Sequence, residues 1–184
     1  MWNENRHPGF PMSSTPEDFS SYCRVIPNFP KKGVDFRDIT TLLKNGPVFK
    51  RAIDTLVWNI RGKADLVVCA EARGFLLGGA IANTLELGLV PVRKKGKLPY
   101  RTKSRNYKLE YGTDSLEIHE DSIQLGQRVL LVDDILATGG TAKAVLDLVL
   151  DLGGKVEAAL FLGEIVSLKG REKFNIPVYS LIQF

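Results

Sequence analysis

Two adjacent carboxylates stand at the end of an apolar run in residues 129–141, which read VLLVDDILATGGT. The run at 129–132 predicts a buried strand of a parallel sheet, because such strands are apolar on both faces. Asp133 and Asp134 end this run abruptly, at the place where open α/β sheets bind their ligands. Their carboxylates can accept hydrogen bonds from hydroxyl groups or join the shell of a metal ion.

The turn after the two aspartates predicts an anion site. Gly139 and Gly140 let the backbone approach a ligand without a side-chain clash. Five backbone N–H groups would point into one concavity at a helix N-terminus, which favours negative charge; they belong to Ala137, Thr138, Gly139, Gly140 and Thr141. The aspartates would repel an anion, so they suit a diol beside it. An anion next to a diol describes a ribose 5-phosphate.

A second turn of the same kind lies in residues 71–75 (EARGF), after a predicted buried strand at 65–70. Arg73 offers a planar fork of donors that suits a diphosphate, and Gly74 permits close backbone approach. The glycines nearby do not form a G-x-G-x-x-G pattern, and no lysine precedes Thr141 as in a Walker A loop. Dinucleotide binding and ATP hydrolysis are therefore disfavoured.

The elements that must position these turns alternate between short apolar runs and segments with helical periodicity. We expect strands at 65–70, 89–93, 129–132, 156–162 and 177–182. Helices are expected at 16–25, 47–60 and 76–85, from residue 144 onward, and briefly at 168–173. This alternation predicts an α/β fold in which helices flank both faces of a central parallel twisted sheet.

Residues 94–104 are basic with little apolar content and predict a mobile loop, joined to a β-ribbon at 106–111 and 115–120. Residues 1–16 are polar and predict a flexible N-terminal extension. The remainder, 17–184, is expected to form a single domain.

The net charge of +4 is unevenly distributed. Eight basic residues and no acidic ones lie in residues 93–108, whereas the remaining 17 basic residues are outnumbered by 21 acidic ones. Such a segment predicts contact with nucleic acid or with a polyanionic small molecule.

Cys23 and Cys69 are the only cysteines and lie far apart, so we expect them to be reduced and buried. No His pattern predicts a zinc site. The longest apolar runs are too short to span a bilayer, and the N-terminus lacks a signal-peptide core. These features predict a cytoplasmic protein.

Residues 129–141 closely resemble the 5-phosphoribosyl-1-pyrophosphate (PRPP) signature of type I phosphoribosyltransferases. Five further motifs resemble, in the right order, the adenine-specific members of that family: residues 33–40 (GVDFRDIT), 71–75 (EARGF), 93–99 (RKKGKLP), 109–112 (LEYG) and 167–171 (SLKGR). The resemblance runs from about Phe19 to the C-terminus. It implies the type I phosphoribosyltransferase fold, with a small hood from residues 26–43 and the C-terminal segment, and a flexible catalytic β-ribbon loop at about 94–114.

The resemblance further implies a purine-salvage enzyme that converts adenine and PRPP to AMP and pyrophosphate through an oxocarbenium-like transition state. Mg²⁺ is expected to arrive with PRPP and assist diphosphate departure, with no direct metal ligand from the protein. A homodimer is implied, with neither nucleic acid nor membrane as a partner.

Each matching residue takes an implied role. Asp133 and Asp134 hold the ribose hydroxyls, with Tyr111 flanking the ribose, and residues 137–141 grip the 5-phosphate. Glu110 matches the family's catalytic acid/base. Arg73, Gly74 and Lys97 are implied to bind the diphosphate. The adenine site is built from Val34 and Arg37 at the edge of the base, and from Phe36 and Ile165 over its face.

Two alternatives stay open. A 6-oxopurine phosphoribosyltransferase would share residues 129–141 but typically has an acid in the central loop, where this chain has Ala137. A PRPP-binding transcription regulator without catalysis would need an N-terminal DNA-binding domain, for which 184 residues leave no room, and would have little reason to keep Glu110. A receiver domain fits poorly, because its acidic pair belongs near the first strand of the chain.

Overall fold

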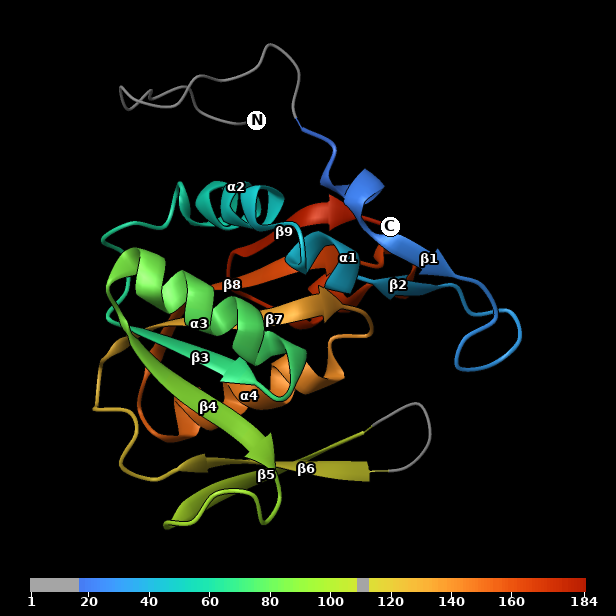
Figure 1. Cartoon of the computed structure of the whole chain (residues 1–184). Helices are drawn as coiled ribbons and strands as arrows, with labels where there is room; N and C mark the ends of the chain where they lie inside the picture. The colour runs from blue at the N-terminus through green and yellow to red at the C-terminus, as the bar shows by residue number, and fades with distance from the viewer. Residues whose placement is uncertain (1–16, 109–112) are drawn as a thin grey trace.

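The computed structural model describes residues 17–108 and 113–184. At its centre is a seven-stranded sheet in the order β5-β6-β4-β3-β7-β8-β9 (Figure 1). The neighbours from β4 to β9 run parallel, and they are β4 (Gly88–Lys94), β3 (Leu66–Ala70), β7 (Arg128–Leu136), β8 (Lys155–Glu164) and β9 (Val178–Gln183). The predicted parallel sheet is confirmed, and β5 and β6 add an antiparallel edge to it.

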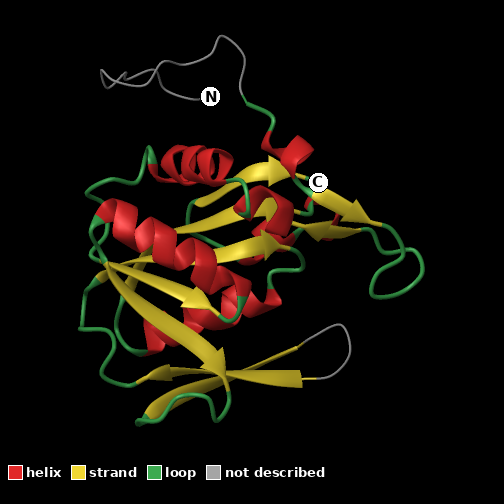
Figure 2. Cartoon of the chain, viewed as in Figure 1, coloured by secondary structure: helices red, strands yellow, loops and turns green. Residues whose placement is uncertain are grey.

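Helices cover both faces of this sheet (Figure 2). The helices α2 (Gly46–Val57) and α3 (Arg73–Leu85) lie on one face, and α4 (Gly140–Asp151) lies on the other. Val67 and Cys69 pack into the core under α2 and α3, while Leu66 and Val68 pack into the core under α4. Alternate side chains of a strand point to opposite faces, so a sheet covered on both sides requires uninterrupted apolar strands.

The antiparallel edge consists of β5 (Thr102–Lys108) and β6 (Thr113–His119). The prediction that residues 102–104 belong to a loop is wrong, because β5 begins at Thr102. Its sequence is polar, but its partner β6 carries the buried Leu116 and Ile118. Cross-strand pairing therefore makes a strand where composition alone does not.

A small hood stands beside the carboxyl ends of the central strands (Figure 1). It contains β1 (Arg24–Ile26) paired with β2 (Phe36–Asp38), followed by the short helix α1 (Thr40–Leu43). Asp38 accepts hydrogen bonds from Thr40 and pairs with Arg24 at 2.5 Å. These bonds lower the pKa of Asp38 to about 2, so the carboxylate that joins β1 to α1 is ionised at neutral pH.

The helix predicted at 16–25 is wrong in extent, because only Phe19–Tyr22 forms a short 3₁₀ helix, η1. Val25 lies exposed in β1 instead of packing with Phe19. The pairing of β1 with β2 and a hydrogen bond from the Arg24 N–H to Thr41 Oγ1 (3.1 Å) draw the chain away from a helical path. Near the C-terminus, the short helix predicted at 168–173 is present as two 3₁₀ helices, η2 (Val166–Leu168) and η3 (Gly170–Lys173). Within 17–108 and 113–184, no helix has the length and apolar character needed to cross a membrane.

Candidate active site

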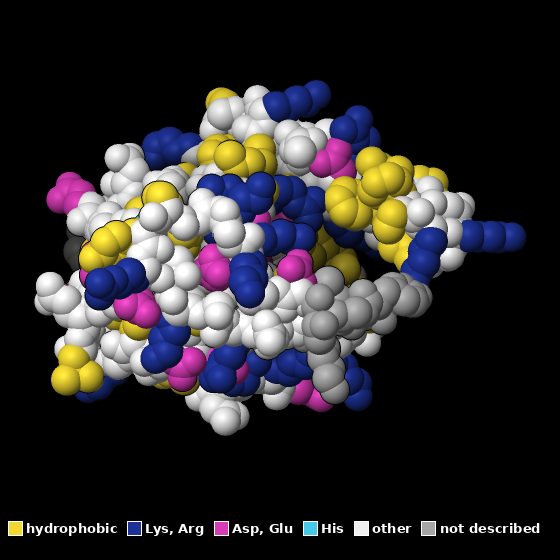
Figure 3. All heavy atoms as spheres, turned by 90° about the horizontal axis from the view of Figure 1, so that it is seen from below, with side chains coloured by type: hydrophobic (Ala, Val, Ile, Leu, Met, Phe, Trp, Pro, Cys, Tyr) yellow, Lys and Arg dark blue, Asp and Glu magenta, His cyan; other side chains and the backbone are white. Residues whose placement is uncertain are grey.

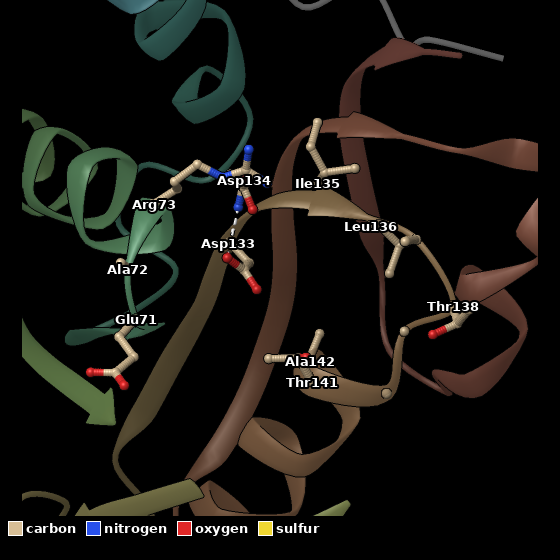
Figure 4. Close-up of a pocket in the computed structure, with 13 residues that line it drawn as sticks. Glu71, Ala72, Arg73, Asp133, Asp134, Ile135, Leu136, Thr138, Thr141 and Ala142 are labelled. Atoms are coloured by element: carbon tan, nitrogen blue, oxygen red, sulfur yellow. Dashed lines mark hydrogen bonds and ion pairs between the residues drawn. The ribbon is translucent and has the colours of Figure 1, made fainter. Parts of the chain in front are cut away.

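The carboxyl ends of β3 and β7 lie side by side, because these parallel neighbours are paired from Leu66 with Val129 to Cys69 with Val132. The turns that follow the two strands line one cavity of about 390 Å³ (Figure 4). The lining consists of Glu71, Ala72 and Arg73, between β3 and the start of α3, and of residues 133–142, which span the end of β7, the turn after it and the first residues of α4. The parallel register thus brings together the two turns that were predicted separately.

The predicted order of strand, turn and helix is confirmed, but its bounds differ. The strand β7 continues through both aspartates to Leu136 instead of ending at residue 132, and α4 begins at Gly140 rather than at residue 144. Gly139 has the left-handed φ of 76° and is the N-cap of α4, and its carbonyl accepts from the Lys143 N–H at 2.9 Å. A side chain is disfavoured in this conformation, which accounts for the glycine. Residues 137–141, called the phosphate loop below, line the cavity with their front face. Phosphate binding by their N–H groups stays a prediction.

The two aspartates occupy different environments within this cavity. Asp134 is buried, and Arg73 Nε lies 2.5 Å from its Oδ2. That oxygen is buried and receives no hydrogen bond from the described residues, so its contact with Arg73 is an ion pair rather than a hydrogen bond. Asp133 Oδ1 accepts from the Asp134 N–H at 2.9 Å. Burial and the neighbouring Asp134 carboxylate raise the pKa of Asp133 well above its ordinary range.

A glycine at position 74 is needed for packing as well as for access of a ligand. A Cβ built on this residue would lie 2.7 Å from Asp133 Oδ1, closer than two such atoms approach. The absence of a side chain therefore lets the first turn of α3 pack against the end of β7. This close approach is what allows Arg73 to reach Asp134.

Glu71 lines the cavity but was not among the predicted site residues. Its carboxylate pairs with Arg93 Nε at 2.8 Å and accepts from the Lys94 N–H at 3.1 Å. The peptide bond between Glu71 and Ala72 is cis. A signal was present in the sequence, because Glu71 directly follows the apolar run of β3, just as Asp133 follows the apolar residues 129–132 within β7.

Phe36 of the hood contacts Arg73, which lines the cavity. The guanidinium carbon of Arg73 lies 5.2 Å from the centre of the Phe36 ring, a cation–π distance. Ile165 is tied to the end of β7 by its N–H, which donates to the Leu136 carbonyl at 2.9 Å. Arg37 instead lies over the ring of Phe184, with its guanidinium carbon 5.0 Å from the ring centre.

Other predicted residues stand apart from the cavity lining. Both backbone groups of Val34 bond within the hood turn, to Lys31 and Phe29. Lys97 lies in the turn between β4 and β5, where its carbonyl accepts from Arg93 Nη1 at 3.2 Å. Glu110 and Tyr111 lie outside the described residues, as does the predicted extension at 1–16.

One face of the molecule carries many charged side chains. Figure 3 shows Lys and Arg side chains gathered in the middle of one face, with acidic side chains among them. Among residues 17–108 and 113–184, no cluster of three or more His, Cys, Asp or Glu side chains could hold a metal ion. Three carboxylates from these residues line the cavity, and Glu71 is paired with Arg93, so Asp133 and Asp134 are the groups that could assist a cation brought by a ligand.

Comparison with known proteins identifies relatives of this chain. A family model described as the phosphoribosyl transferase domain matches residues 40–180. The chain is 51% identical to an adenine phosphoribosyltransferase of Brevibacillus brevis over 169 residues, which cover 91% of this chain and 99% of that protein. It is similar to the crystal structure of adenine phosphoribosyltransferase from Thermoanaerobacter pseudethanolicus, with a TM-score of 0.86 and 52% identity over 89% of this chain and 96% of that one. The Saccharomyces cerevisiae adenine phosphoribosyltransferase, solved with an imino-altritol bisphosphate and adenine, gives a TM-score of 0.81 at 38% identity over 88% of this chain and 94% of that one.

Proposed function

Because the chain belongs to the adenine phosphoribosyltransferase family, we infer that it serves purine salvage by transferring the phosphoribosyl group of PRPP to adenine. The products are AMP and pyrophosphate. The observation that carries this conclusion is 51% identity to an adenine phosphoribosyltransferase over 91% of the chain. The cavity between the two strand-end turns supports it, since it offers acceptors for a diol beside a glycine turn suited to a phosphate.

The phosphoribosyl group occupies the cavity in this proposal. The phosphate loop receives the 5-phosphate, and Asp133 with Asp134 accepts hydrogen bonds from the ribose hydroxyls. The diphosphate lies at the turn that follows β3, where Arg73 and Gly74 contact it, and Lys97 reaches it from the basic turn. The ion pair of Arg73 Nε with Asp134 supports this orientation, because it leaves the two NH₂ groups of the guanidinium to address phosphate oxygens.

Adenine lies between the cavity and the hood. Phe36 and Ile165 cover the faces of the base, and Val34 and Arg37 meet its edge. The position of Phe36 beside Arg73 supports a base next to the diphosphate, since C1′ must lie between the two. Val34 must exchange its present bonds within the hood turn if its backbone is to reach the base.

The reaction breaks the bond from C1′ to the diphosphate oxygen, and the electron pair leaves with pyrophosphate. Glu110 takes the proton of adenine N7, so that the lone pair of N9 is free to form the new bond to C1′. The transition state has oxocarbenium character, as in glycosyl transfer generally. Tyr111 flanks the ribose, and closure of the basic ribbon over the site excludes water that would otherwise hydrolyse PRPP.

Mg²⁺ accompanies PRPP in this proposal. The cavity fits a magnesium complex because oxygen ligands suit Mg²⁺ and the carboxylates of Asp133 and Asp134 stand at its wall. A magnesium ion carried by PRPP would supply neutralisation of the charge that develops on the departing pyrophosphate. The protein holds the ribose hydroxyls and the diphosphate rather than the ion itself. Removal of divalent metal with EDTA should abolish AMP formation, and added Mg²⁺ should restore it.

We also propose a homodimeric, cytoplasmic protein. Leu76 on α3 and Leu89 on β4 are 54% and 44% exposed on two elements that pack together, and a second copy could cover them. Both cysteines are free, as the reducing cytoplasm favours. Sedimentation velocity of the wild type beside Leu76→Glu tests the dimer, which the added charge should weaken.

The decisive experiment is ultraviolet-detected turnover of adenine, hypoxanthine and guanine with PRPP and Mg²⁺. AMP formation from adenine alone is the expected result. Glu110→Gln should lower kcat by roughly 10²–10⁴-fold, because the variant cannot take the proton. Glu157→Gln, which changes an exposed glutamate of β8, is the matched control and should behave as the wild type.

Two outcomes would contradict the proposal. Efficient turnover of hypoxanthine or guanine would place the protein with the 6-oxopurine enzymes. Binding of PRPP without turnover of any base would indicate a regulator that has lost catalysis. Wild-type kcat in Glu110→Gln would remove Glu110 from the mechanism while leaving the substrate assignment intact.

A further inference from the structure

The motif at residues 167–171 lies behind the phosphate loop. Gly170 is buried, and a Cβ built on it would overlap the carbonyl oxygen of Ala137 and lie 3.1 Å from the Gly139 nitrogen. In the opposite direction, a Cβ built on Gly139 would lie 2.7 Å from the Gly170 carbonyl oxygen. Two backbones are therefore packed directly on each other, and a side chain on either one would separate them.

This contact touches the rear of the loop and leaves its front free. Residues 137–141 line the cavity, whereas Gly170 is not among the lining residues. Gly170 therefore does not compete for a ligand. Its position determines how far the loop can retreat from the cavity, and so where the N–H groups of the loop lie.

An ion pair anchors the residue that follows Gly170. Arg171 reaches Glu164 through two nitrogens, with Nε 3.2 Å from Oε1 and Nη2 2.5 Å from Oε2. Ser180 adds a hydroxyl hydrogen bond to the same carboxylate at 2.9 Å, and Arg171 Nη1 donates to the Val178 carbonyl. A bidentate arginine fork has a fixed plane, so this network holds the backbone at residue 171 in a defined place.

The carboxylate in this network is ionised despite its burial. Glu164 is 4% exposed, at the last residue of β8. Burial alone would raise the pKa of Glu164, but hydrogen bonds from Arg171 and Ser180 outweigh it and hold the pKa below its ordinary value. The ion pair is thus complete at neutral pH.

The same segment is attached to β7 at a second point. The Ile165 N–H donates to the Leu136 carbonyl at 2.9 Å, one residue before the phosphate loop. On the other side, Phe174 packs against Phe161 in the core below α4, with ring centres 6.4 Å apart. The segment from 165 to 174 is therefore a rigid support, fastened to the core at both ends.

We propose that Gly170 and the Glu164–Arg171 ion pair are positioning residues, which hold the phosphate loop in the shape that receives the phosphate monoester of a pentose. The proposal rests on the proposed function, since it deepens the role of that loop. It assigns the SLKGR motif to the 5-phosphate subsite, although none of its residues contacts the ligand.

The test is isothermal titration of the full chain with ribose 5-phosphate, and separately with pyrophosphate in the presence of Mg²⁺. Gly170→Ala should weaken ribose 5-phosphate binding by roughly 10- to 100-fold, because a loop displaced by about 1 Å no longer matches its ligand. Pyrophosphate binding should be unchanged, since that subsite belongs to the turn after β3. The matched control is Gly46→Ala at the first residue of α2, where an added Cβ meets nothing within 4 Å.

Three outcomes would overturn the inference. One is wild-type affinity of Gly170→Ala for ribose 5-phosphate. A second is an equal loss of both ligands with a lower melting temperature, which indicates a merely structural role. If Gly170→Ala cannot be purified, Arg171→Lys replaces it, and an unchanged ribose 5-phosphate affinity in that variant is the third. Failure of the wild type to bind ribose 5-phosphate or to turn over adenine would instead count against the proposed function.

Discussion

Arg73 Nε lies 2.5 Å from Asp134 Oδ2, so an ion pair joins the start of α3 to the end of β7. The same guanidinium group lies 5.2 Å from the centre of the Phe36 ring in the hood. The residue proposed for the diphosphate thus contacts one residue proposed for the ribose and one proposed for the base. Asp134 and Phe36 together orient the guanidinium plane, which is the feature that distinguishes arginine from lysine.

Arg73→Lys is expected to weaken binding of pyrophosphate with Mg²⁺ by about tenfold or more. The variant keeps the charge but loses the planar fork, and a hydrogen bond to a charged group contributes about 1.5–3 kcal/mol. Isothermal titration measures the change, with Arg61→Lys at an exposed position as the control. Equal affinity in Arg73→Lys and the wild type would show that the fork does not contact the diphosphate.

Asp133→Asn is expected to stabilise the folded chain while it lowers AMP formation. The pKa of Asp133 is raised by burial and by Asp134, so the native state holds a proton that the unfolded state releases. Stability of the wild type therefore falls as pH rises above about 4, the ordinary pKa of an aspartate, toward the raised pKa of the folded state. Asparagine does not ionise, so the variant does not lose stability as the pH rises through this range.

Urea denaturation at several pH values tests this expectation. At pH 7 the free energy of unfolding of Asp133→Asn should exceed that of the wild type by about 1 kcal/mol, and the difference should shrink toward pH 4. Asp35→Asn, at an exposed position of the hood, is the control. A difference that does not depend on pH would contradict the stated cause.

Gly78→Ala is expected to lower the free energy of unfolding by about 1–3 kcal/mol, the usual effect of overpacking. A Cβ at Gly78 would lie 2.6 Å from Cys69 Sγ, on the strand beneath α3, and would push the helix off the sheet. Gly79→Ala is a matched control on the same helix, because a Cβ there meets nothing within 4 Å. That control should be neutral or stabilising, since alanine favours a helix. Similar melting temperatures for the two variants would refute the packing argument.

Glu117→Leu is expected to raise KM for PRPP by about 3- to 10-fold, with little change in KM for adenine. Glu117 is buried, and its Oε2 accepts from the Gly96 N–H at 2.9 Å, which holds the turn that carries Lys97. Loss of one such bond corresponds to about 1 kcal/mol. Glu117→Gln keeps an acceptor oxygen and should remain close to the wild type in steady-state assays. Equal KM values for PRPP in both variants would show that this bond does not position Lys97.

The chemistry of the site could be predicted from local sequence, because strand ends, helix starts and glycine turns are encoded by neighbouring residues. Asp133, Asp134 and Gly139 lie where those rules place them, and the resemblance to phosphoribosyltransferases identified the reaction. Local rules failed at Thr102, where a polar segment becomes a strand only because Leu116 and Ile118 of its partner are buried. The roles of Glu110 and Tyr111 remain predictions outside the described residues.

The sequence alone therefore determined the kind of residues at the site and where along the chain each turn lies. Only the tertiary structure decided which turns meet: the pairing of β3 with β7 sets Arg73 against Asp134, and the path of the chain after β8 sets Gly170 against the phosphate loop. Glu71 lines the cavity because the pairing of β3 with β7 also brings the end of β3 to it. Burial patterns repeat over a few residues and can be read along the chain, whereas contacts between distant segments depend on strand register and packing across the sheet.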